Sequence, residues 1–278
     1  MIEIFLLLVV LGIFAGLLSG FFGIGSGVIL VPAYFFLFNF LNFPEEIIPL
    51  LATGTSMTTM VLVIPNAALT HYFNSNVNLE IVKKMFVFVF CFTIFARYVA
   101  LQMDSITLQL IIAVSLVIAA FQVAIDIKPK KIAPKINSME LAVASCAIGL
   151  ITSLVGIGGG ILMVPYFTFR GLSMREAIGT SSVMGFCIAV SGSIGGLLFA
   201  PESSETINWL IGSAYVPAVL IVGLSSIYFA KMGAKISNKT SSKNLRLAFA
   251  FVVIVSAVRI IYDTLICCLL YTSDAADD

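Results

Sequence analysis

The sequence is poor in charge: only 10% of its 278 residues are Asp, Glu, Lys or Arg, and it holds one histidine and one tryptophan. Soluble domains carry about 25% charged residues. Apolar residues make up 60% of the chain instead, and its mean hydropathy is +1.11. A core surrounded by water cannot hide so much apolar surface, which excludes a soluble enzyme or a nucleic-acid-binding protein. Long apolar runs joined by short polar loops predict an all-α polytopic membrane protein.

The scarcity of ligand and catalytic residues excludes several kinds of site. One histidine cannot supply the paired histidines of a zinc protease. No Lys-Ser/Thr pair follows the glycine-rich runs, and no strand precedes them, so neither a phosphate loop nor a dinucleotide fingerprint is present. Four cysteines lie singly in apolar runs and are expected to be small core residues: Cys91, Cys146, Cys187 and Cys267. We therefore expect no enzyme, no metal site and no cofactor.

Residues 268–278 read as the in-frame translation of a sequencing-library adapter. A short natural polar tail is the alternative. We leave this segment out of the reasoning on fold.

Ten apolar segments follow one another along the rest of the chain, and most reach the roughly 20 residues that a helix needs to cross a bilayer. The second and the seventh are too short for a comfortable crossing, and each follows a glycine run, where a helix would break. The segments lie near residues 2–22, 28–43, 47–69, 85–103, 108–125, 139–154, 160–169, 177–199, 209–229 and 245–266.

The two halves of the chain repeat each other. Residues 16–32 match residues 149–165 without a gap, and residues 52–56 match residues 177–181 in the same order. Two matches in the same order indicate an internal duplication. The expected division is a first membrane repeat at 1–127, a cytoplasmic linker at 128–138, and a second membrane repeat at 139–267.

Charge placement predicts how the repeats are oriented. Basic residues concentrate in cytoplasmic loops, which places the lysine-rich linker inside. With this orientation 13 of the 15 Lys and Arg residues are cytoplasmic, the exceptions being Arg97 and Arg259. Because each half has five segments, the second half enters from the opposite side, and the repeats are inverted. The inverted orientation follows whether a short segment crosses the membrane fully or forms a re-entrant pair with the segment before it, because both return the chain to the side from which it started.

Inverted repeats with broken helices are a common plan for secondary transporters, and the breaks are where substrate binds. A helix that restarts after a break offers unpaired N–H groups and a partial positive charge to an anion. Close helix packing is the alternative role for such glycines. Nearby hydroxyls, Thr53 among them, would add donors. The candidate substrate-binding residues are Gly23, Gly25, Ser26, Gly27, Thr55, Ser56, Gly156, Gly158, Gly159, Gly160, Thr180 and Ser181.

Ionisable residues inside membrane segments are functional candidates, and there are few. Arg97 and Arg259 both lie toward the outer side. Arg259 would either neutralise an anion or extend to the lipid headgroups. His71 ends the third segment and is expected to be structural. No carboxylate lies clearly at mid-membrane.

The paired motifs resemble those of the TauE/SafE family of sulfite exporters, over about residues 5–266. One departure is Ser26, where the family usually has glycine. The resemblance implies export of sulfite, sulfoacetate or a related small sulfur-containing or organic anion across a bacterial inner membrane, with the anion and the bilayer as partners and no nucleic acid. The alternatives are an uptake permease and a non-transporting membrane scaffold or sensor. The residues that carry the resemblance are Gly20, Gly23–Gly27, Val31–Pro32, Ala52, Gly54–Ser56, Gly156–Gly160, Val164–Pro165, Ala177 and Gly179–Ser181.

Overall fold

The computed structural model describes residues 2–22, 26–124, 137–201, 207–237, 250–251 and 253–262. Within these ranges the chain is almost entirely helical, as expected for an all-α membrane protein. Most of the proposed linker and the whole adapter-like tail lie outside them. The elements are α1 (Ile2–Phe22), α2 (Gly27–Phe40), α3 (Ile48–Phe73), α4 (Leu79–Gln102), α5 (Ser105–Ala124), α6 (Ser138–Val155), α7 (Gly160–Phe169), α8 (Met174–Leu198), β1 (Leu210–Ile211), β2 (Ala214–Tyr215) and α9 (Val216–Ser237), followed by an apolar helix at Val253–Tyr262.

Four of the described helices, α3, α5, α6 and α8, are long and apolar enough to cross a membrane. The two segments expected to be short are short: α2 has 14 residues and α7 has 10. Helices of 14 and 10 residues are about 21 and 15 Å long, which is less than the roughly 30 Å hydrocarbon core. The chain is therefore a polytopic membrane protein in which each half contains one broken, incomplete crossing.

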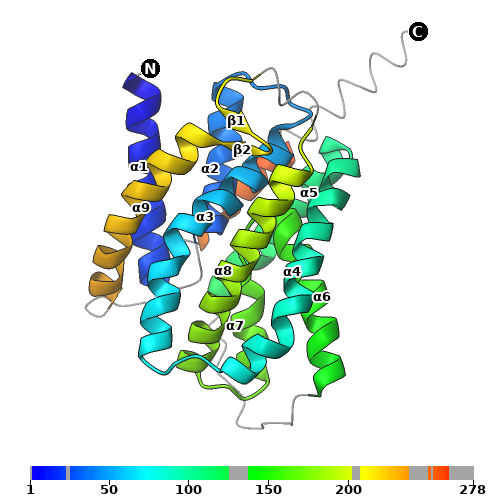
Figure 1. Ribbon diagram of the computed structural model, residues 1–278. Coiled ribbons are helices and arrows are strands. Elements are labelled where there is room, and N and C mark those ends of the chain that lie inside the picture. The colour runs from blue at the N-terminus through cyan, green and yellow to red at the C-terminus, as the bar shows by residue number, and fades with distance from the viewer. Residues whose placement is uncertain are drawn as a thin grey trace.

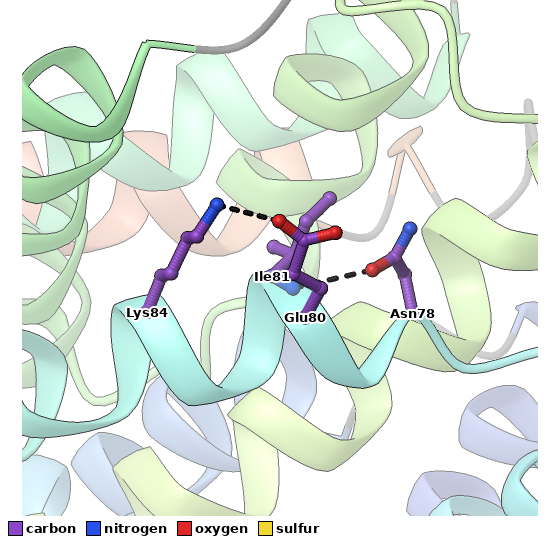
Figure 2. A network of polar contacts seen from close by, with 4 residues as sticks. All are labelled: Asn78, Glu80, Ile81 and Lys84. Carbon is purple, nitrogen blue, oxygen red and sulfur yellow. Dashed lines mark hydrogen bonds and ion pairs between the residues drawn. The ribbon is translucent and has the colours of Figure 1, made fainter.

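Polar caps define where several helices begin. The Asn78 side chain accepts a hydrogen bond from the Ile81 N–H at 3.2 Å at the start of α4, and the Glu80–Lys84 ion pair follows one turn later (Figure 2). At the start of α8, Ser173 and Glu176 form a reciprocal capping box. Such caps satisfy N–H groups that the first turn leaves unpaired.

The two halves are arranged in opposite directions. The short helix α2 lies at the end of the molecule that holds the β1–β2 hairpin, whereas α7 lies at the other end, near the α3–α4 connection (Figure 1). Helices α3 and α8 pack against each other in the centre, α1 packs along α9, and α6 packs along α4. The first helix of each half thus packs on the fourth helix of the other half. Two inverted repeats produce this exchange.

Equivalent glycines mediate the two outer helix pairs. A Cβ at Gly16 of α1 would lie 2.6 Å from the carbonyl oxygen of Ser226 on α9, and a Cβ at Gly149 of α6 would lie 3.0 Å from that of Val89 on α4. Gly16 and Gly149 correspond in the sequence repeat. Small residues let membrane helices approach this closely.

The expected ninth segment begins later than its apolar pattern suggested. Residues 209–215 were expected to be part of a helix, but they contain the short antiparallel hairpin in which Leu210 pairs with Tyr215. Trp209 and Gly212 have positive φ values of 67° and 61°. A right-handed helix cannot continue through such residues, so α9 begins only at Val216.

Candidate functional site

The start of α2 packs directly against the second glycine run. A Cβ at Gly27 would lie 2.6 Å from the Ile157 Cα and 2.7 Å from the Gly156 carbonyl oxygen. Only glycine permits two backbones to come this close. The glycine runs of the two halves, 133 positions apart in the repeat, therefore meet at one place, which we call the glycine junction (Ser26, Gly27, Gly156 and Ile157).

Helix α3 forms the wall of the glycine junction. Gly156 ends α6 in the left-handed conformation, with a φ of 75°. Its Cα faces Thr53, because a Cβ added to Gly156 would lie 2.8 Å from the Thr53 Cα. The Ser56 hydroxyl donates a hydrogen bond to the Gly156 carbonyl oxygen at 2.8 Å. The predicted residues Ser26, Gly27, Ser56 and Gly156 are thus brought together.

Ser26 is the residue before α2, and its side chain is completely buried. Its hydroxyl has no hydrogen-bond partner among the residues that the structure describes, although its carbonyl oxygen accepts from the N–H groups of Ile29 and Leu30. A buried hydroxyl without a partner is costly. It is therefore a donor available to a bound group at the positive end of α2.

The start of α7 has an apolar environment instead. Added Cβ atoms at Gly158 and Gly159 would lie 2.8 Å from the Met60 sulfur and 2.7 Å from the Ile188 Cδ1. Gly160 begins the helix and is buried. These three predicted residues follow the glycine junction along the chain, and Gly158 and Gly159 have thioether and aliphatic neighbours.

The other predicted hydroxyls form hydrogen bonds away from the glycine junction. Thr55 accepts a hydrogen bond from the Tyr215 N–H at 3.1 Å, and Thr180 accepts one from the Asn78 N–H at 3.0 Å. Ser181 donates to the Ile178 carbonyl oxygen of its own helix. None of the three contacts the glycine junction through these bonds. Gly23 and Gly25 lie outside the described residues.

Arg97 was a functional candidate only as an ionisable residue in a membrane segment and was not among the candidate substrate-binding residues, but the structure places it near this junction. Arg97 is completely buried and donates to the Thr53 hydroxyl at 2.8 Å, the Leu50 carbonyl oxygen at 3.1 Å and the Ser213 hydroxyl at 3.0 Å. Its position among apolar residues of α4 was the signal available in the sequence. The contact with Ser213 could not be predicted from the sequence, because Ser213 is distant from Arg97 along the chain.

The charged groups of this region can be compared with those in the rest of the described chain. In the described part of the chain, one ion pair joins the exposed side chains of Glu80 and Lys84, and another joins the partly exposed side chains of Glu140 and Arg170. Arg97 takes part in neither. The described residues also contain no group of three His, Cys, Asp or Glu able to hold a metal ion. Hydroxyls, a helix N-terminus and one guanidinium suit a small anion.

Comparison with known proteins identifies the family of the chain. The family model described as "Sulfite exporter TauE/SafE" matches residues 8–260. No solved structure matches the chain.

Curated relatives extend the likeness to whole proteins. A "Probable membrane transporter protein" of Haemophilus influenzae is 28% identical over 93% of this chain and 98% of its own length. A protein of the same description from Methanocaldococcus jannaschii is 28% identical over 87% of this chain and 89% of its own. The probable membrane transporter protein YunE of Bacillus subtilis is 24% identical over 93% and 98%. With nearly its whole length matched by the family model, the chain belongs to the TauE/SafE sulfite exporter family and is a multi-pass membrane transporter.

Proposed function

We propose that this transporter exports sulfite or a related small sulfur-containing or organic anion, and that the anion binds at the glycine junction. The observation that carries the proposal is the buried, unpartnered hydroxyl of Ser26 at the start of α2, against the backbone of Gly156 and Ile157. This hydroxyl would donate to the anion together with those first-turn N–H groups of α2 that do not already donate to the Ser26 carbonyl oxygen. The broken segments would then serve binding as well as packing.

The direction follows from the membrane potential. A cell that is negative inside favours anion efflux by about 2.3 kcal/mol per charge per 100 mV. A divalent anion would gain roughly twice that, which corresponds to about a thousandfold gradient with no coupled proton. We propose the bacterial inner membrane as the location and the two repeats at 1–127 and 139–267 as the functional halves.

Purified protein in proteoliposomes tests the function. Flux would be measured for sulfite, sulfate, sulfoacetate and a simple carboxylate, with the gradient and the potential imposed in each direction. We expect saturable flux of a sulfur oxyanion, driven outward by a potential negative on the cytoplasmic face. Flux driven only inward would favour an uptake permease, and no flux of any anion would favour a scaffold or sensor.

A pair of variants at Ser26 tests the site. Ser26→Asp places a negative charge where the anion must lie, and we expect it to abolish flux. Ser26→Asn is similar in size and uncharged, and we expect it to retain most flux. Both variants should insert to the same level, measured by quantitative blotting of membranes. If the Asp and Asn variants transport equally well, the anion does not bind at this helix start.

A further inference from the structure

Arg97 carries a positive charge that the described residues do not neutralise. Its side chain is completely buried, and it forms no ion pair in the part of the chain that the structure describes. Its three hydrogen-bond acceptors are neutral oxygens. A charge buried without a counter-charge is costly, even when hydrogen bonds partly replace its hydration. A protein retains such a group where a charged ligand provides the compensation.

Extension toward lipid headgroups does not explain this arginine. A guanidinium that extends to the headgroups ends in water, whereas the guanidinium of Arg97 is held inside by Thr53, Leu50 and Ser213. Arg170 shows the contrasting case, since it is partly exposed and pairs with Glu140.

One edge of the guanidinium has a free donor. Within the described ranges the Nε–H of Arg97 has no hydrogen-bond partner, and Nη2 donates to the Ser213 hydroxyl. A Cβ at Gly196 would lie 2.5 Å from the Ser213 Oγ and 3.9 Å from the Arg97 Nε. The Ser213 hydroxyl and the free Nε–H therefore lie on the same side of the guanidinium, facing a residue without a side chain.

A single residue, Thr53, lies between the Arg97 guanidinium and the glycine junction. Thr53 accepts from Arg97 through its hydroxyl, while its Cα and Cβ lie against Gly156. A group that moves from the glycine junction toward the β1–β2 hairpin would pass Thr53 and meet Arg97, because Ser213 belongs to the hairpin turn.

We propose that the Nε–Nη2 edge of Arg97 is an oxyanion-binding site on the transport path, and that Ser213 occupies Nη2 when no anion is bound. An anion with two oxygens on one centre, such as a sulfite, a sulfonate or a carboxylate, would replace Ser213 and accept from Nε and Nη2 side by side. This inference rests on the proposed function and identifies a second position for the same anion. A single-atom anion such as chloride cannot make the paired contact.

The primary test compares three variants in sulfite flux and in sulfite-dependent thermal stabilisation of purified protein, with chloride at equal ionic strength as the reference. Arg97→Gln keeps polar donors but loses the charge, and we expect its sulfite affinity to fall roughly 30-fold or more. Arg97→Lys keeps the charge but loses the two side-by-side N–H donors of the guanidinium, so its loss of sulfite affinity should be intermediate. Arg170→Gln is the matched control and should respond to sulfite as the wild type does.

A second pair of variants decides the matter if Arg97→Gln fails to fold. Ser213→Ala removes the hydroxyl that occupies Nη2 and should retain the sulfite response. Adding Gly196→Ala to Ser213→Ala places a methyl group over the Nε edge without changing any charge, and removal of the hydroxyl leaves room for it. We expect the double variant to lose the sulfite response that the single variant keeps.

The outcomes separate this inference from the proposed function. A wild-type protein that carries sulfite, together with an Arg97→Gln variant or a double variant that carries it equally well, would overturn the Arg97 site alone. A wild-type protein with neither sulfite flux nor sulfite-dependent stabilisation would overturn the proposed function, and the Arg97 site with it.

Discussion

The hydroxyl of Thr180 accepts a hydrogen bond from the backbone N–H of Asn78 at 3.0 Å, and the equivalent threonine of the other half makes an equivalent contact. Thr55 corresponds to Thr180 and accepts from the Tyr215 N–H at 3.1 Å. In both cases the threonine of one half binds the segment that enters α4 or α9 of the other half. These two contacts lie toward opposite ends of the molecule (Figure 1). They suit the two closures that alternating access requires.

We expect Thr180→Val and Thr55→Val to destabilise the protein by similar amounts. Each change removes the acceptor of a partly buried backbone N–H group, at a cost of about 1–3 kcal/mol. The thermal midpoint of purified protein in detergent should fall in both single variants. The two sites lie far apart, so the double variant should show the sum of the two decreases.

Two glycines on α8 provide a matched test of the same contact. A Cβ at Gly179 would collide with the Asn76 carbonyl oxygen, whereas a Cβ at Gly185 would lie 3.8 Å from the Ile64 Cδ1. Gly179→Ala should therefore lower the thermal midpoint clearly, and Gly185→Ala should leave it unchanged. Equal midpoints for the two alanine variants would show that the Asn76–Asn78 segment does not pack on α8 as described.

Packing between α1 and α9 predicts an insertion defect in Gly16→Leu. The added side chain would meet the Ser226 backbone on α9, which cannot move aside as a flexible side chain can. The control is Val10→Leu, because Val10 lies on the same helix with 47% of its surface exposed. Blotting of membrane fractions should show reduced protein for Gly16→Leu and a wild-type level for Val10→Leu.

Charge placement predicts the orientation in the membrane, and two exposed asparagines allow a matched test. Asn208 precedes β1 and should face the periplasm, while Asn74 follows α3 and should face the cytoplasm. In a background without native cysteines, Asn208→Cys should react with an impermeant maleimide added to intact cells, and Asn74→Cys should react only after lysis. Labelling in the reverse pattern would invert the assignment.

The exposed pair at the start of α4 predicts a small pH dependence. The Lys84 ammonium lowers the pKa of Glu80 below its ordinary value of 4.5 by a hydrogen bond and by its charge. Because the folded-state pKa is the lower one, the stabilisation is complete above pH 4.5 and is lost as the pH falls through the folded-state pKa. The difference in thermal midpoint between wild type and Glu80→Gln should therefore be present at pH 7 and shrink below pH 4.5. A difference that grows on acidification would contradict this.

The site itself was only partly predictable. The glycine runs predicted two helix restarts, and α2 and α7 begin at Gly27 and Gly160. Their different environments could not be read from the pattern, since Met60 and Ile188 come from other helices. Gly158 has a φ of 59°, so a leucine there would strain the backbone whether or not an anion passes. The Ser26 pair is consequently the cleaner test of anion binding.

The sequence by itself determined that the protein lies in a lipid bilayer, that it is helical and that its two halves repeat. Scarce charge and apolar runs of membrane-spanning length specify a bilayer protein whatever the packing, and the matched segments imply that the same local structure forms twice. Only the tertiary structure decided which atoms meet. Thr53 and Gly156 are about one hundred residues apart in the chain, and Arg97 and Ser213 are farther apart still. Their contacts depend on how helices of opposite halves pack, and no local pattern encodes that geometry.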